Sequence, residues 1–343
     1  MSYQITLQPS GHHFTVEEGE RILSAGLASH LRMPYGCRMG TCRSCRGKVV
    51  SGNIELGDAH PTYLPQSQRD EGYALLCQAT ARSDLVINLE ELPQLAEPRE
   101  APVIVKELTR HTDDVMIVTL RVPLHLNMRY APGQYVDLLL GGGMKRSYSI
   151  ANPPLDGTVD LQFHIRHLPG GAFTERLFGG MKPREKLQIE GPLGAFFLRD
   201  SDKPALLIAS GTGYAPIRAI LLHSLPQKTG RKMVLYWGGR RLRDIYMFEE
   251  ATALAKQYPD FSFVPVLSEP DAADEWTGRT GFVHTVAMQD MPDLSSWQAY
   301  ACGTPAMVEA ARTEFSAICG LPQEQFFADS FITQAELAAE MIG

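Results

Sequence analysis

The chain has 343 residues, 44% hydrophobic and 21% charged, so it is long enough for two or three folded domains and too apolar for a disordered protein. Its formal net charge of −7 argues against general nucleic-acid binding. No apolar run reaches membrane-spanning length, the N-terminus lacks the features of a signal peptide, and the six cysteines do not suggest a disulfide framework. We therefore expect a cytoplasmic protein without a membrane span.

The first ninety or so residues predict a small domain of strands and one helix. Apolar residues at helical spacing predict the helix over Glu20–Leu27. Short segments with strand-like alternation predict strands, the third of them with a turn, at Tyr3–Leu7, His13–Val16, Gly47–Gly52 and Asp84–Leu89.

Four cysteines in this region have the spacing of metal ligands. Cys37, Cys42 and Cys45 form a C-x4-C-x2-C pattern, and Cys77 follows about thirty residues later. This is the plant-type pattern for a [2Fe–2S] cluster, in which four thiolates hold two irons. Zinc or a set of buried free thiols is the alternative, although zinc ligands usually come as two close pairs in the sequence.

The loop around the first three cysteines is rich in small residues. Gly36, Gly40, Thr41 and Ser44 allow backbone N–H groups to turn toward the sulfurs. The loop resembles the plant-type ferredoxin module. That resemblance implies a β-grasp domain around the cluster, covering residues 1–92.

A proline-rich linker and a β-rich region follow. Residues 93–102 hold three prolines, which predicts a semi-rigid linker. Residues 103–200 predict a barrel-like domain with a helix over Ala172–Phe178. Its short strands, separated by Gly and Pro turns, are expected at Val103–Leu108, Val115–Val122, Tyr135–Leu140, Val159–Ile165 and Leu187–Glu190.

Arg146-Ser147-Tyr148-Ser149 is a short motif that by itself fits an ordinary strand. Ala131–Val136 precedes it, and His164–Thr174 and Gly191–Gly194 follow it. This ordered set resembles the flavin domain of the ferredoxin–NAD(P)H reductase superfamily. The resemblance implies a Greek-key β-barrel that binds FAD.

The resemblance also implies roles for individual residues. Arg146 would pair with the flavin phosphate, which suits its planar charged fork, Tyr148 would lie against the isoalloxazine, and Ser149 would hydrogen-bond the ring's edge as a catalytic residue. Gly170, Gly171 and the Thr174 hydroxyl would favour a phosphate at the start of the following helix, a simple helix cap being the alternative. The expected cofactor-binding set also includes Ser147, His164, Ile165 and Arg166.

Residues 201–343 alternate between strand and helix, which predicts a doubly wound parallel sheet. Strands are expected at Pro204–Ala209, Val234–Trp237, Phe263–Val266 and Ala299–Ala301. Helices are expected at Ile217–Leu225, Tyr246–Gln257 and Pro305–Ala317.

Gly211-Thr212-Gly213 is part of a dinucleotide-binding fingerprint, but Pro216 replaces its third glycine. With Cys302-Gly303 near the end of the chain, it resembles the nucleotide domain of the same superfamily. Both glycines of the turn would let the backbone approach a pyrophosphate, and Pro216 would start the helix without using an N–H. The resemblance places Cys302, as a catalytic residue, and Gly303 beside the nicotinamide; a small buried hydrophobe is the alternative for Cys302.

Three arginines bear on the choice of coenzyme. Arg240, Arg241 and Arg243 follow the second strand, and by charge they suit the 2′-phosphate of NADPH. Relatives with similar arginines often use NADH, and there arginine can stack on adenine. We expect NADH, with NADPH left open and Arg240 among the coenzyme-binding residues.

The three modules in this order resemble the reductase component of a bacterial multicomponent oxygenase, or the related CDP-6-deoxy-glucoseen reductase. The resemblance implies an oxidoreductase that takes hydride from NADH to FAD and passes single electrons through the [2Fe–2S] cluster. The acceptor would be a partner oxygenase or deoxysugar dehydratase. A stand-alone flavin or ferric reductase and a redox-sensing cluster protein are the alternatives.

Basic residues gather in the sequence around the cysteines. The segment without acidic residues between Glu20 and Glu55 contains Arg32, Arg38, Arg43, Arg46 and Lys48. Its exposed members would steer an acidic partner surface, and Arg43 is expected to reach solvent because it lies between two ligands. Stabilisation of the cluster's own negative charge is the equal alternative.

An aromatic residue near the C-terminus has an implied role. In the superfamily such a residue covers the flavin and yields to nicotinamide, and Phe331 stands in that position as a catalytic residue. Residues 332–343 extend beyond it as a tail whose role is left open.

Overall fold

The computed structural model describes residues 1–154 and 160–331 of the chain. These residues form two compact units. Among the described residues, the first unit holds Met1–Leu95 and Ala328–Phe331, and the second holds Ala96–Phe327. Within the described ranges, no helix is both long enough and apolar enough to cross a lipid bilayer.

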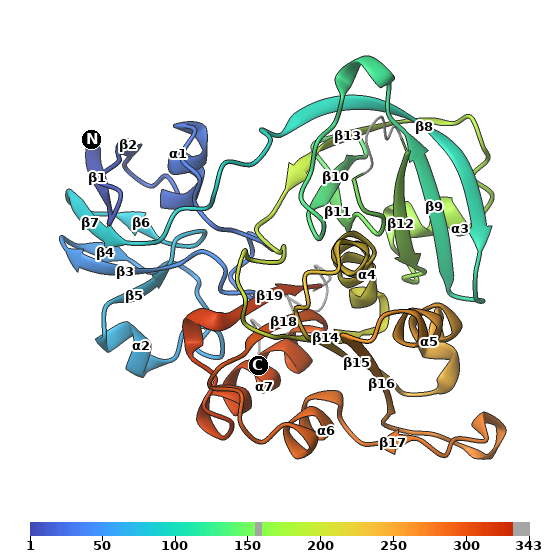
Figure 1. Ribbon diagram of the computed structural model, residues 1–343. Coiled ribbons are helices and arrows are strands. Elements are labelled where there is room, and N and C mark those ends of the chain that lie inside the picture. The colour runs from blue at the N-terminus through green and yellow to red at the C-terminus, as the bar shows by residue number, and fades with distance from the viewer. Residues whose placement is uncertain (155–159, 332–343) are drawn as a thin grey trace. The chain divides into compact units, whose positions relative to one another are not determined.

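The first unit is built on a five-stranded sheet with the strand order β2-β1-β7-β3-β5, drawn in blue in Figure 1. Strand β1 runs antiparallel to β2 and parallel to the central strand β7. The strands are β1 (Ser2–Gln8), β2 (His13–Glu17), β3 (Arg46–Ser51), β5 (Tyr73–Leu75) and β7 (Leu85–Asn88), with β4 (Ile54–Glu55) and β6 (Thr80–Ala81) as a small second sheet. The helices are α1 (Ile22–Ala28) and α2 (Gln66–Asp70).

Alternation of apolar residues explains why the first two strands form. Ile5 and Leu7 of β1 are buried, Phe14 lies opposite Ile5 on β2, and the residues between them are more exposed. Helix α1 packs its apolar side against this sheet and begins at Ile22, two residues after the expected Glu20. The predicted β-grasp fold is confirmed.

The predicted linker 93–102 is shorter in the structure. Strand β8 (Arg99–Arg110) begins inside it, so its last four residues are strand. Pro102 fits because it pairs with Gln188 on one side, whereas the pairing of β8 with β9 on the other side begins only at Ile104. A proline lacks an N–H, and it is tolerated where a strand has a neighbour on one side only.

The first half of the second unit is a barrel of six antiparallel strands in the order β11-β10-β13-β8-β9-β12. The remaining strands are β9 (Val115–Arg121), β10 (Tyr135–Leu139), β11 (Lys145–Ser149), β12 (Asp160–Arg166) and β13 (Lys186–Leu193). Just after β11, the Ala151 N–H donates to the Gln162 carbonyl of β12 at 2.8 Å, which closes the barrel. This is the predicted Greek-key barrel. Residue 159, expected to start a strand, lies outside the described residues.

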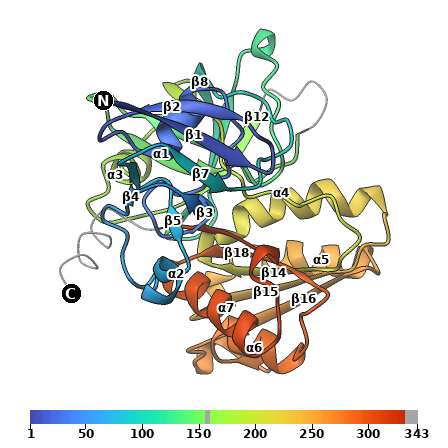
Figure 2. The same cartoon turned by 90° about the vertical axis from the view of Figure 1, so that its left-hand side faces the viewer.

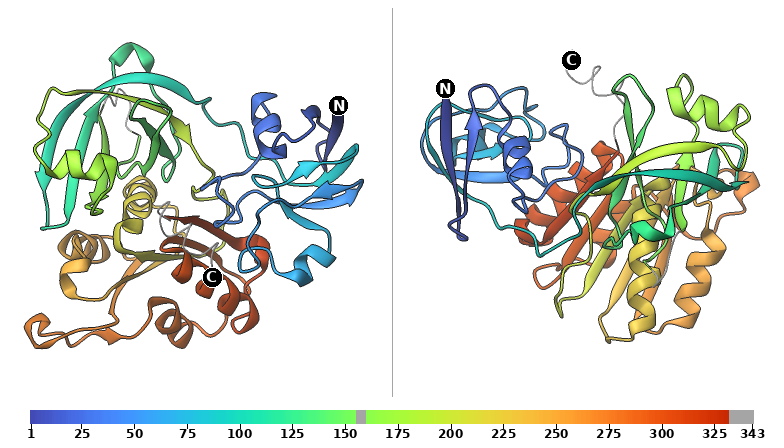
Figure 3. Two further views of the ribbon diagram at one scale, coloured as in Figure 1. Left: turned by 180° about the vertical axis from the view of Figure 1, so that it is seen from behind. Right: turned by 90° about the horizontal axis from the view of Figure 1, so that it is seen from above.

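Helix α3 (Ala172–Phe178) lies alongside the barrel strands, as Figure 3 shows in its left view. Its Phe173 and Leu177 side chains belong to the barrel's apolar core. The helix therefore fastens the loop that precedes it, Leu168–Gly171, to the end of β12.

The second half of this unit contains a sheet in the order β17-β16-β15-β14-β18-β19. Its strands are β14 (Ala205–Ser210), β15 (Met233–Gly239), β16 (Phe261–Leu267), β17 (Arg279–Thr280), β18 (Gln298–Gly303) and β19 (Phe326–Ser330), whose last three residues group with the first unit. The pairs from β17 to β18 are parallel. The helices are α4 (Tyr214–Ser224), α5 (Phe248–Gln257), α6 (Val283–Asp290) and α7 (Pro305–Ala317).

In Figures 1 and 2, α4 and α5 lie on one side of this sheet, and α6 and α7 lie on the other. The predicted doubly wound sheet is confirmed. Strands such as β14 are buried on both faces, which explains their continuous apolar sequence. Short 3-10 turns complete the chain at Leu124–Leu126, Gly211–Gly213, Leu225–Gln227, Leu242–Asp244, Ala272–Asp274 and Gln323–Gln325.

Candidate functional site

The four predicted metal ligands lie in the first unit as two pairs of sulfurs. The side chains of Cys37 and Cys42 hydrogen-bond to each other, and those of Cys45 and Cys77 do the same. Strand pairing brings the second pair together, because Arg46 of β3 lies opposite Leu75 of β5 and the Leu76 N–H donates to the Cys45 carbonyl at 3.1 Å. The structure thus brings the four predicted ligands together as two neighbouring pairs, with Cys37 near enough to Cys77 for their charges to interact.

Two pairs of thiols fit a [2Fe–2S] cluster, in which four cysteines are divided between two irons. A zinc ion would draw its ligands to a single point. The paired arrangement therefore favours the cluster as the group that these cysteines hold.

The cysteine loop has an unusual backbone that directs N–H groups toward sulfur. Arg38 and Arg43 have φ values of 57° and 63°, in the left-handed region that non-glycine residues rarely adopt. The N–H groups of Met39 and Cys42 point at the Cys37 sulfur at 3.4 Å each. These donors favour a thiolate at Cys37.

The electrostatics of the loop agree with that geometry. The hydrogen bond from the Cys42 thiol, assisted by the Thr41 hydroxyl and backbone N–H groups, lowers the pKa of Cys37 to about 5 although burial opposes it. The same contact raises the pKa of Cys42, because only one of two touching thiols loses its proton easily. Metal binding removes both protons, and the loop supplies donors that suit sulfur ligands.

A C-terminal segment, Ala328–Ser330, lies against this loop within the first unit. The Ser330 and Thr41 hydroxyls are 3.0 Å apart, and the Ser44 hydroxyl donates to the Ala328 carbonyl at 3.0 Å. Between them, Asp329 is buried, and burial together with the charge of Cys37 raises its pKa to about 7. Sequence reasoning missed these contacts, because nothing in the composition of the segment relates it to cysteines nearly three hundred residues earlier.

In the second unit, the motif Arg146–Ser149 forms strand β11 at one end of the barrel sheet. The Ser147 hydroxyl donates to the Asp137 carboxylate at 2.6 Å, so it holds β11 to β10. The partly buried guanidinium of Arg146 donates to the Lys145 carbonyl at 2.8 Å. Neither the Ser147 bond nor the Arg146 bond involves the barrel core. Arg146 therefore lies at the surface, and its pairing with the flavin phosphate stays a prediction.

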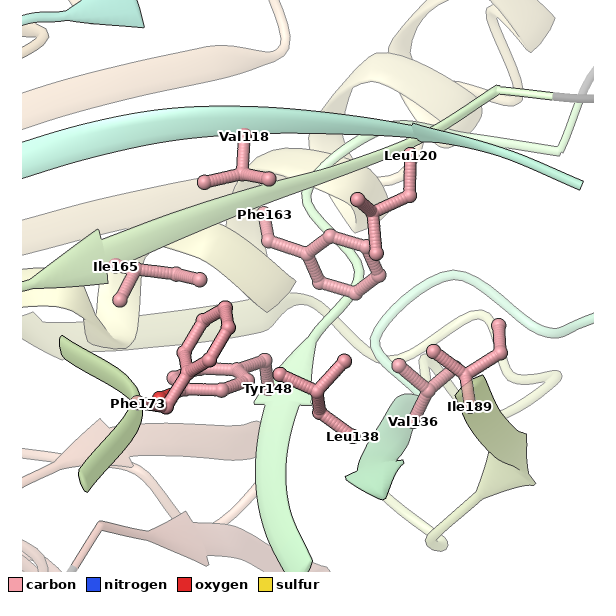
Figure 4. A pocket seen from close by; sticks show the side chains of 9 residues that line it. All are labelled: Val118, Leu120, Val136, Leu138, Tyr148, Phe163, Ile165, Phe173 and Ile189. Atoms are coloured by element: carbon pink, nitrogen blue, oxygen red, sulfur yellow. The ribbon is translucent and has the colours of Figure 1, made fainter. Parts of the chain in front are cut away.

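The Tyr148 ring lies in the barrel interior, 5.7 Å from the ring of Phe173 (Figure 4). It lines a cavity of about 10 Å³, which has room for roughly one water molecule and not for a flavin. Ile165 lines the same cavity and is a core residue, which leaves only its backbone for a cofactor. The lining is Val118, Leu120, Val136, Leu138, Tyr148, Phe163, Ile165, Phe173 and Ile189.

Two buried polar atoms near the barrel's end lack partners. Ser149 and His164 are 6% and 5% exposed, and among the described residues neither the Ser149 Oγ nor the His164 Nε2 has a hydrogen-bond partner. Leaving a buried polar atom unpaired costs about 1–3 kcal/mol. Both residues were predicted to bind the cofactor, and these unpaired atoms fit a polar ligand such as the flavin ring's edge.

The His164 ring is held in its neutral form. Burial, helped by the positive charge of Arg218, lowers the pKa of His164 to about 3. The Tyr246 hydroxyl lies 2.8 Å from Nδ1, and because burial raises the pKa of Tyr246 it stays protonated and can donate. In that arrangement Nε2 carries the proton and is a hydrogen-bond donor.

The predicted phosphate turn uses its donors internally. The Thr174 hydroxyl donates to the Leu168 carbonyl at 2.8 Å, the Gly171 N–H donates to the same carbonyl at 2.9 Å, and the Gly170 N–H donates to the Glu175 carboxylate at 2.8 Å. A carboxylate therefore stands where the phosphate was expected. The alternative of a helix cap agrees better with these contacts, and phosphate binding at this turn remains a prediction.

The glycine turn after β14 meets the end of β18 with almost no space between them. A Cβ on Gly213 would lie 2.1 Å from the Cys302 carbonyl oxygen, and one on Gly303 would lie 2.1 Å from the Ser210 hydroxyl. Gly303 also has a φ of 153°. Cys302 is fully buried, and Pro216 lies in the first turn of α4. The structure thus brings together Gly211, Thr212, Gly213, Cys302 and Gly303 at the carboxyl edge of the parallel sheet, where α/β folds bind nucleotides.

The three arginines after β15 have different surroundings. Arg241 is held by the carboxylates of Asp271 and Asp274. Arg240 and Arg243 are exposed. Arg240 and Arg243 are therefore accessible from solvent, whereas the charge of Arg241 is compensated by two carboxylates.

Sequence reasoning missed a polar contact between the barrel and the nucleotide sheet. Arg218 of α4 makes two bonds to the Glu250 carboxylate, at 2.6 and 2.7 Å, and donates to the Ala151 carbonyl at 2.9 Å. Arg218 is the single charged residue in the apolar run Ile217–Leu225, and that isolation was the available signal. Tyr246, which contacts His164, carried no such signal.

Comparison with known families accounts for three parts of the chain. Residues 5–82 match the 2Fe-2S iron-sulfur cluster binding domain, residues 102–198 the oxidoreductase FAD-binding domain, and residues 207–313 the oxidoreductase NAD-binding domain. Curated relatives cover the whole arrangement. The CDP-6-deoxy-L-threo-D-glycero-4-hexulose-3-dehydrase reductase of Yersinia pestis is 36% identical over 334 residues, which is 97% of this chain and 99% of the relative.

The chain belongs to the iron–sulfur flavoprotein reductases of the ferredoxin–NAD(P)H reductase superfamily. The reductase component DmpP of phenol 2-monooxygenase from Pseudomonas sp. (strain CF600) is 34% identical over 347 residues, covering 99% of this chain and 97% of that protein. The crystal structure of the Amycolatopsis cytochrome P450 reductase GcoB has a TM-score of 0.74 at 32% identity, covering 96% of this chain and 98% of that one.

Membership in this family confirms the predicted cofactors and type of reaction. This reductase is an oxidoreductase that uses a [2Fe–2S] cluster, FAD and NADH. The assignment of individual residues to each cofactor stays a prediction. The observed contacts support it most directly for the two cysteine pairs and for Ser149 and His164.

The basic residues of this reductase's cluster unit differ from the expectation at one position. Arg43 is 8% exposed, and its guanidinium donates to the Thr62 carbonyl at 2.6 Å, so the expectation that it reaches solvent is wrong. Its left-handed φ turns the side chain inward to close the loop. Arg32, Arg38 and Lys48 are exposed, and Arg46 lies over the Tyr73 ring with its guanidinium 4.7 Å from the ring centre.

Phe331 is the last residue that the structure describes, and its side chain is 37% exposed. It groups with the first unit. Its predicted role as a cover for the flavin stays a prediction. The tail 332–343 lies outside the described residues.

Proposed function

We propose that this reductase passes electrons from NADH to a separate acceptor protein, either the terminal component of an oxygenase or a deoxysugar dehydratase. The main support for the proposal is that one chain contains the two cysteine pairs, a flavin barrel and a nucleotide-binding sheet. A stand-alone flavin reductase has no use for a one-electron centre. Relatives whose names state a dehydrase or a monooxygenase partner support this class of acceptor.

The residues divide the task. When bound, FAD takes a hydride from NADH and releases electrons singly, and a [2Fe–2S] cluster carries one electron at a time. The ligands of the cluster would be Cys37, Cys42, Cys45 and Cys77. In the barrel, the Ser149 hydroxyl and the His164 Nε2 would hydrogen-bond the flavin, and the neutral His164 would add no charge beside it.

At the sheet edge, Gly213 and Gly303 let the glycine turn pack closely against the end of β18, and Gly211 has no side chain to obstruct the nicotinamide nucleotide that would bind beside this turn. Cys302 would lie behind that surface, since its side chain is buried. Exposed Arg240 would meet the adenosine end. With Arg241 bound to two carboxylates, fewer cations remain for a 2′-phosphate, which favours NADH over NADPH.

The partner would approach the exposed cations Arg32, Arg38 and Lys48, with Arg46 beside them. These residues belong to the same unit as the cysteines, and the whole chain is acidic. A basic surface on an acidic protein attracts an acidic partner selectively and speeds its association.

An anaerobic titration with NADH tests the proposal without needing the partner. A flavin that takes two electrons and a cluster that takes one require about 1.5 equivalents of NADH per chain for full reduction. Absorbance and EPR spectra should show both centres reduced at that point. An end point near one equivalent, with the cluster still oxidised when a mediator dye is present, would contradict electron flow from flavin to cluster.

A further inference from the structure

The segment Ala328–Ser330 contacts the two residues of the cysteine loop whose hydroxyls face sulfur. Ser330 and Thr41 are 4% and 3% exposed, and their hydroxyl oxygens are 3.0 Å apart. Ser44 donates to the Ala328 carbonyl at 3.0 Å. These contacts join residues nearly three hundred positions apart in the sequence, and all of them lie inside the first unit.

Thr41 connects Ser330 to a ligand sulfur. Its hydroxyl lies 3.3 Å from the Cys37 Sγ and donates to it. A hydroxyl has a single proton to donate, so when Thr41 donates to Cys37 the contact with Ser330 must be one that Thr41 accepts. Ser330 is then the donor, and its bond fixes the rotation of the Thr41 hydroxyl toward the sulfur.

Ser44 links the segment Ala328–Ser330 to a second ligand sulfur, that of Cys42. Its hydroxyl is within hydrogen-bonding reach of the Cys42 sulfur as well as of the Ala328 carbonyl. One proton cannot serve both acceptors fully, so the carbonyl competes with the sulfur for it. The segment therefore strengthens one hydrogen bond to sulfur, through Thr41, and limits another, through Ser44.

Hydrogen bonds to the ligand sulfurs are one of the factors that set the reduction potential of an iron–sulfur cluster. We infer that Ala328–Ser330 sets the reduction potential of the cluster by fixing how Thr41 and Ser44 hydrogen-bond to its sulfur ligands. Ser330 is a positioning residue, because it acts through Thr41 and does not touch sulfur itself. The inference rests on the proposed function in one respect, the assignment of Cys37 and Cys42 as ligands.

A double-mutant cycle on the full-length holoprotein tests this chain of contacts. Thr41→Val removes the O–H···S bond and should lower the equilibrium constant for cluster reduction about fivefold, since one hydrogen bond is worth about 1 kcal/mol. At 59 mV per tenfold change for one electron, the potential should fall by ~40 mV. Ser330→Ala should shift it in the same direction by no more than that amount, and in the Thr41→Val background it should add nothing further.

The measurement is a redox titration of the cluster followed by EPR, with iron and sulfide content determined for each variant. Ser67→Ala, an exposed serine of α2 in the same unit, is the matched control and should leave the potential unchanged. Ser330→Thr keeps the hydroxyl and should retain the wild-type potential.

Two results would overturn the inference while leaving the ligand assignment intact. One is an unchanged potential in Ser330→Ala when Thr41→Val lowers it, and the other is a Ser330 effect that adds fully to that of Thr41→Val. If neither Thr41→Val nor Ser330→Ala changes the reduction potential, the result would also count against Cys37 as a ligand. If Ser330→Ala binds no iron, wild type and Ser330→Thr can be compared by resonance Raman spectroscopy, and Fe–S bands insensitive to D2O in both would overturn the inference.

Discussion

At the scale of single residues, the cysteines separate the two halves of the electron path. Cys42 is buried within the first sulfur pair, and a hydroxyl in place of its thiol is a poor iron ligand. In Cys42→Ser we expect loss of the cluster with FAD retained. Reduction of cytochrome c should fall about tenfold or more, while NADH-dependent reduction of ferricyanide stays within about twofold.

Cys319→Ser is the control for that change. Cys319 is equally buried but lies in the second unit, outside the cysteine pairs, and its replacement should leave both activities intact. Loss of FAD together with the cluster in Cys42→Ser would contradict the independence of the two sites.

His164 predicts how stability depends on pH. Its pKa is about 3 in the folded protein against an ordinary value of 6.5, so the unfolded chain binds the extra proton between these values. The stabilisation is therefore complete above pH 6.5 and is lost as pH falls through the window toward 3, at about 1.4 kcal/mol per pH unit.

Replacement of His164 by Gln should flatten this dependence. Denaturant unfolding at pH 7.0 and 5.5 should show a smaller pH-dependent loss of stability in His164→Gln, by about 1.4 kcal/mol. His13→Gln, which changes an exposed histidine of β2, should behave like wild type. An equal loss in wild type and His164→Gln would mean that the His164 ring can be protonated inside the fold.

At the scale of elements, the glycine turn after β14 packs very closely against the end of β18 in the nucleotide sheet. Gly213 has a helical φ of −58°, so alanine is acceptable to the backbone there, but its Cβ would meet the Cys302 carbonyl oxygen at 2.1 Å. In Gly213→Ala we expect the turn to move away from Cys302 and Gly303, and the KM for NADH to rise about tenfold or more.

The FAD spectrum should be unchanged in Gly213→Ala, because the barrel is not involved. Ser224→Ala, at the far end of the same helix, is the control and should keep the wild-type KM. A wild-type KM in Gly213→Ala would show that this turn does not border the coenzyme.

The sequence predicts features that depend on neighbouring residues better than features that depend on contacts between residues far apart in the chain. The cysteine spacing and the alternation of β1, β2 and α1 are local patterns, and they predicted the sites and types of these elements correctly. Arg43 was misjudged because its left-handed φ turns it toward Thr62, and spacing does not encode that direction. The contacts of Ser330 with Thr41 and of Tyr246 with His164 depend on tertiary packing, which no short motif announces.

At the scale of the whole molecule, charge predicts how the reductase meets its acceptors. Reversing Arg38 and Lys48 together to Glu removes exposed positive charge from the cluster unit. Reduction of an acidic acceptor protein such as cytochrome b5 should slow about tenfold at low salt, and reduction of basic cytochrome c should not slow. The difference should vanish near 1 M salt, where the Debye length is about 3 Å.

A charge reversal elsewhere separates local steering from net charge. Lys203→Glu changes an exposed lysine of the second unit and should have little effect on either acceptor. Equal slowing with both acceptors, or none with either, would mean that electrons leave the reductase by another surface.

The first unit combines two distant stretches of the chain, which has a consequence for biosynthesis. Ribosomes add about 5–20 residues per second, so the partners of Thr41 and Ser44 emerge roughly 15–60 s after the cysteine loop itself. During that interval the nascent loop is made but lacks Ala328, Asp329 and Ser330. The first unit is therefore begun early in translation but gains its contacts at Thr41 and Ser44 only after Ala328–Ser330 have been made.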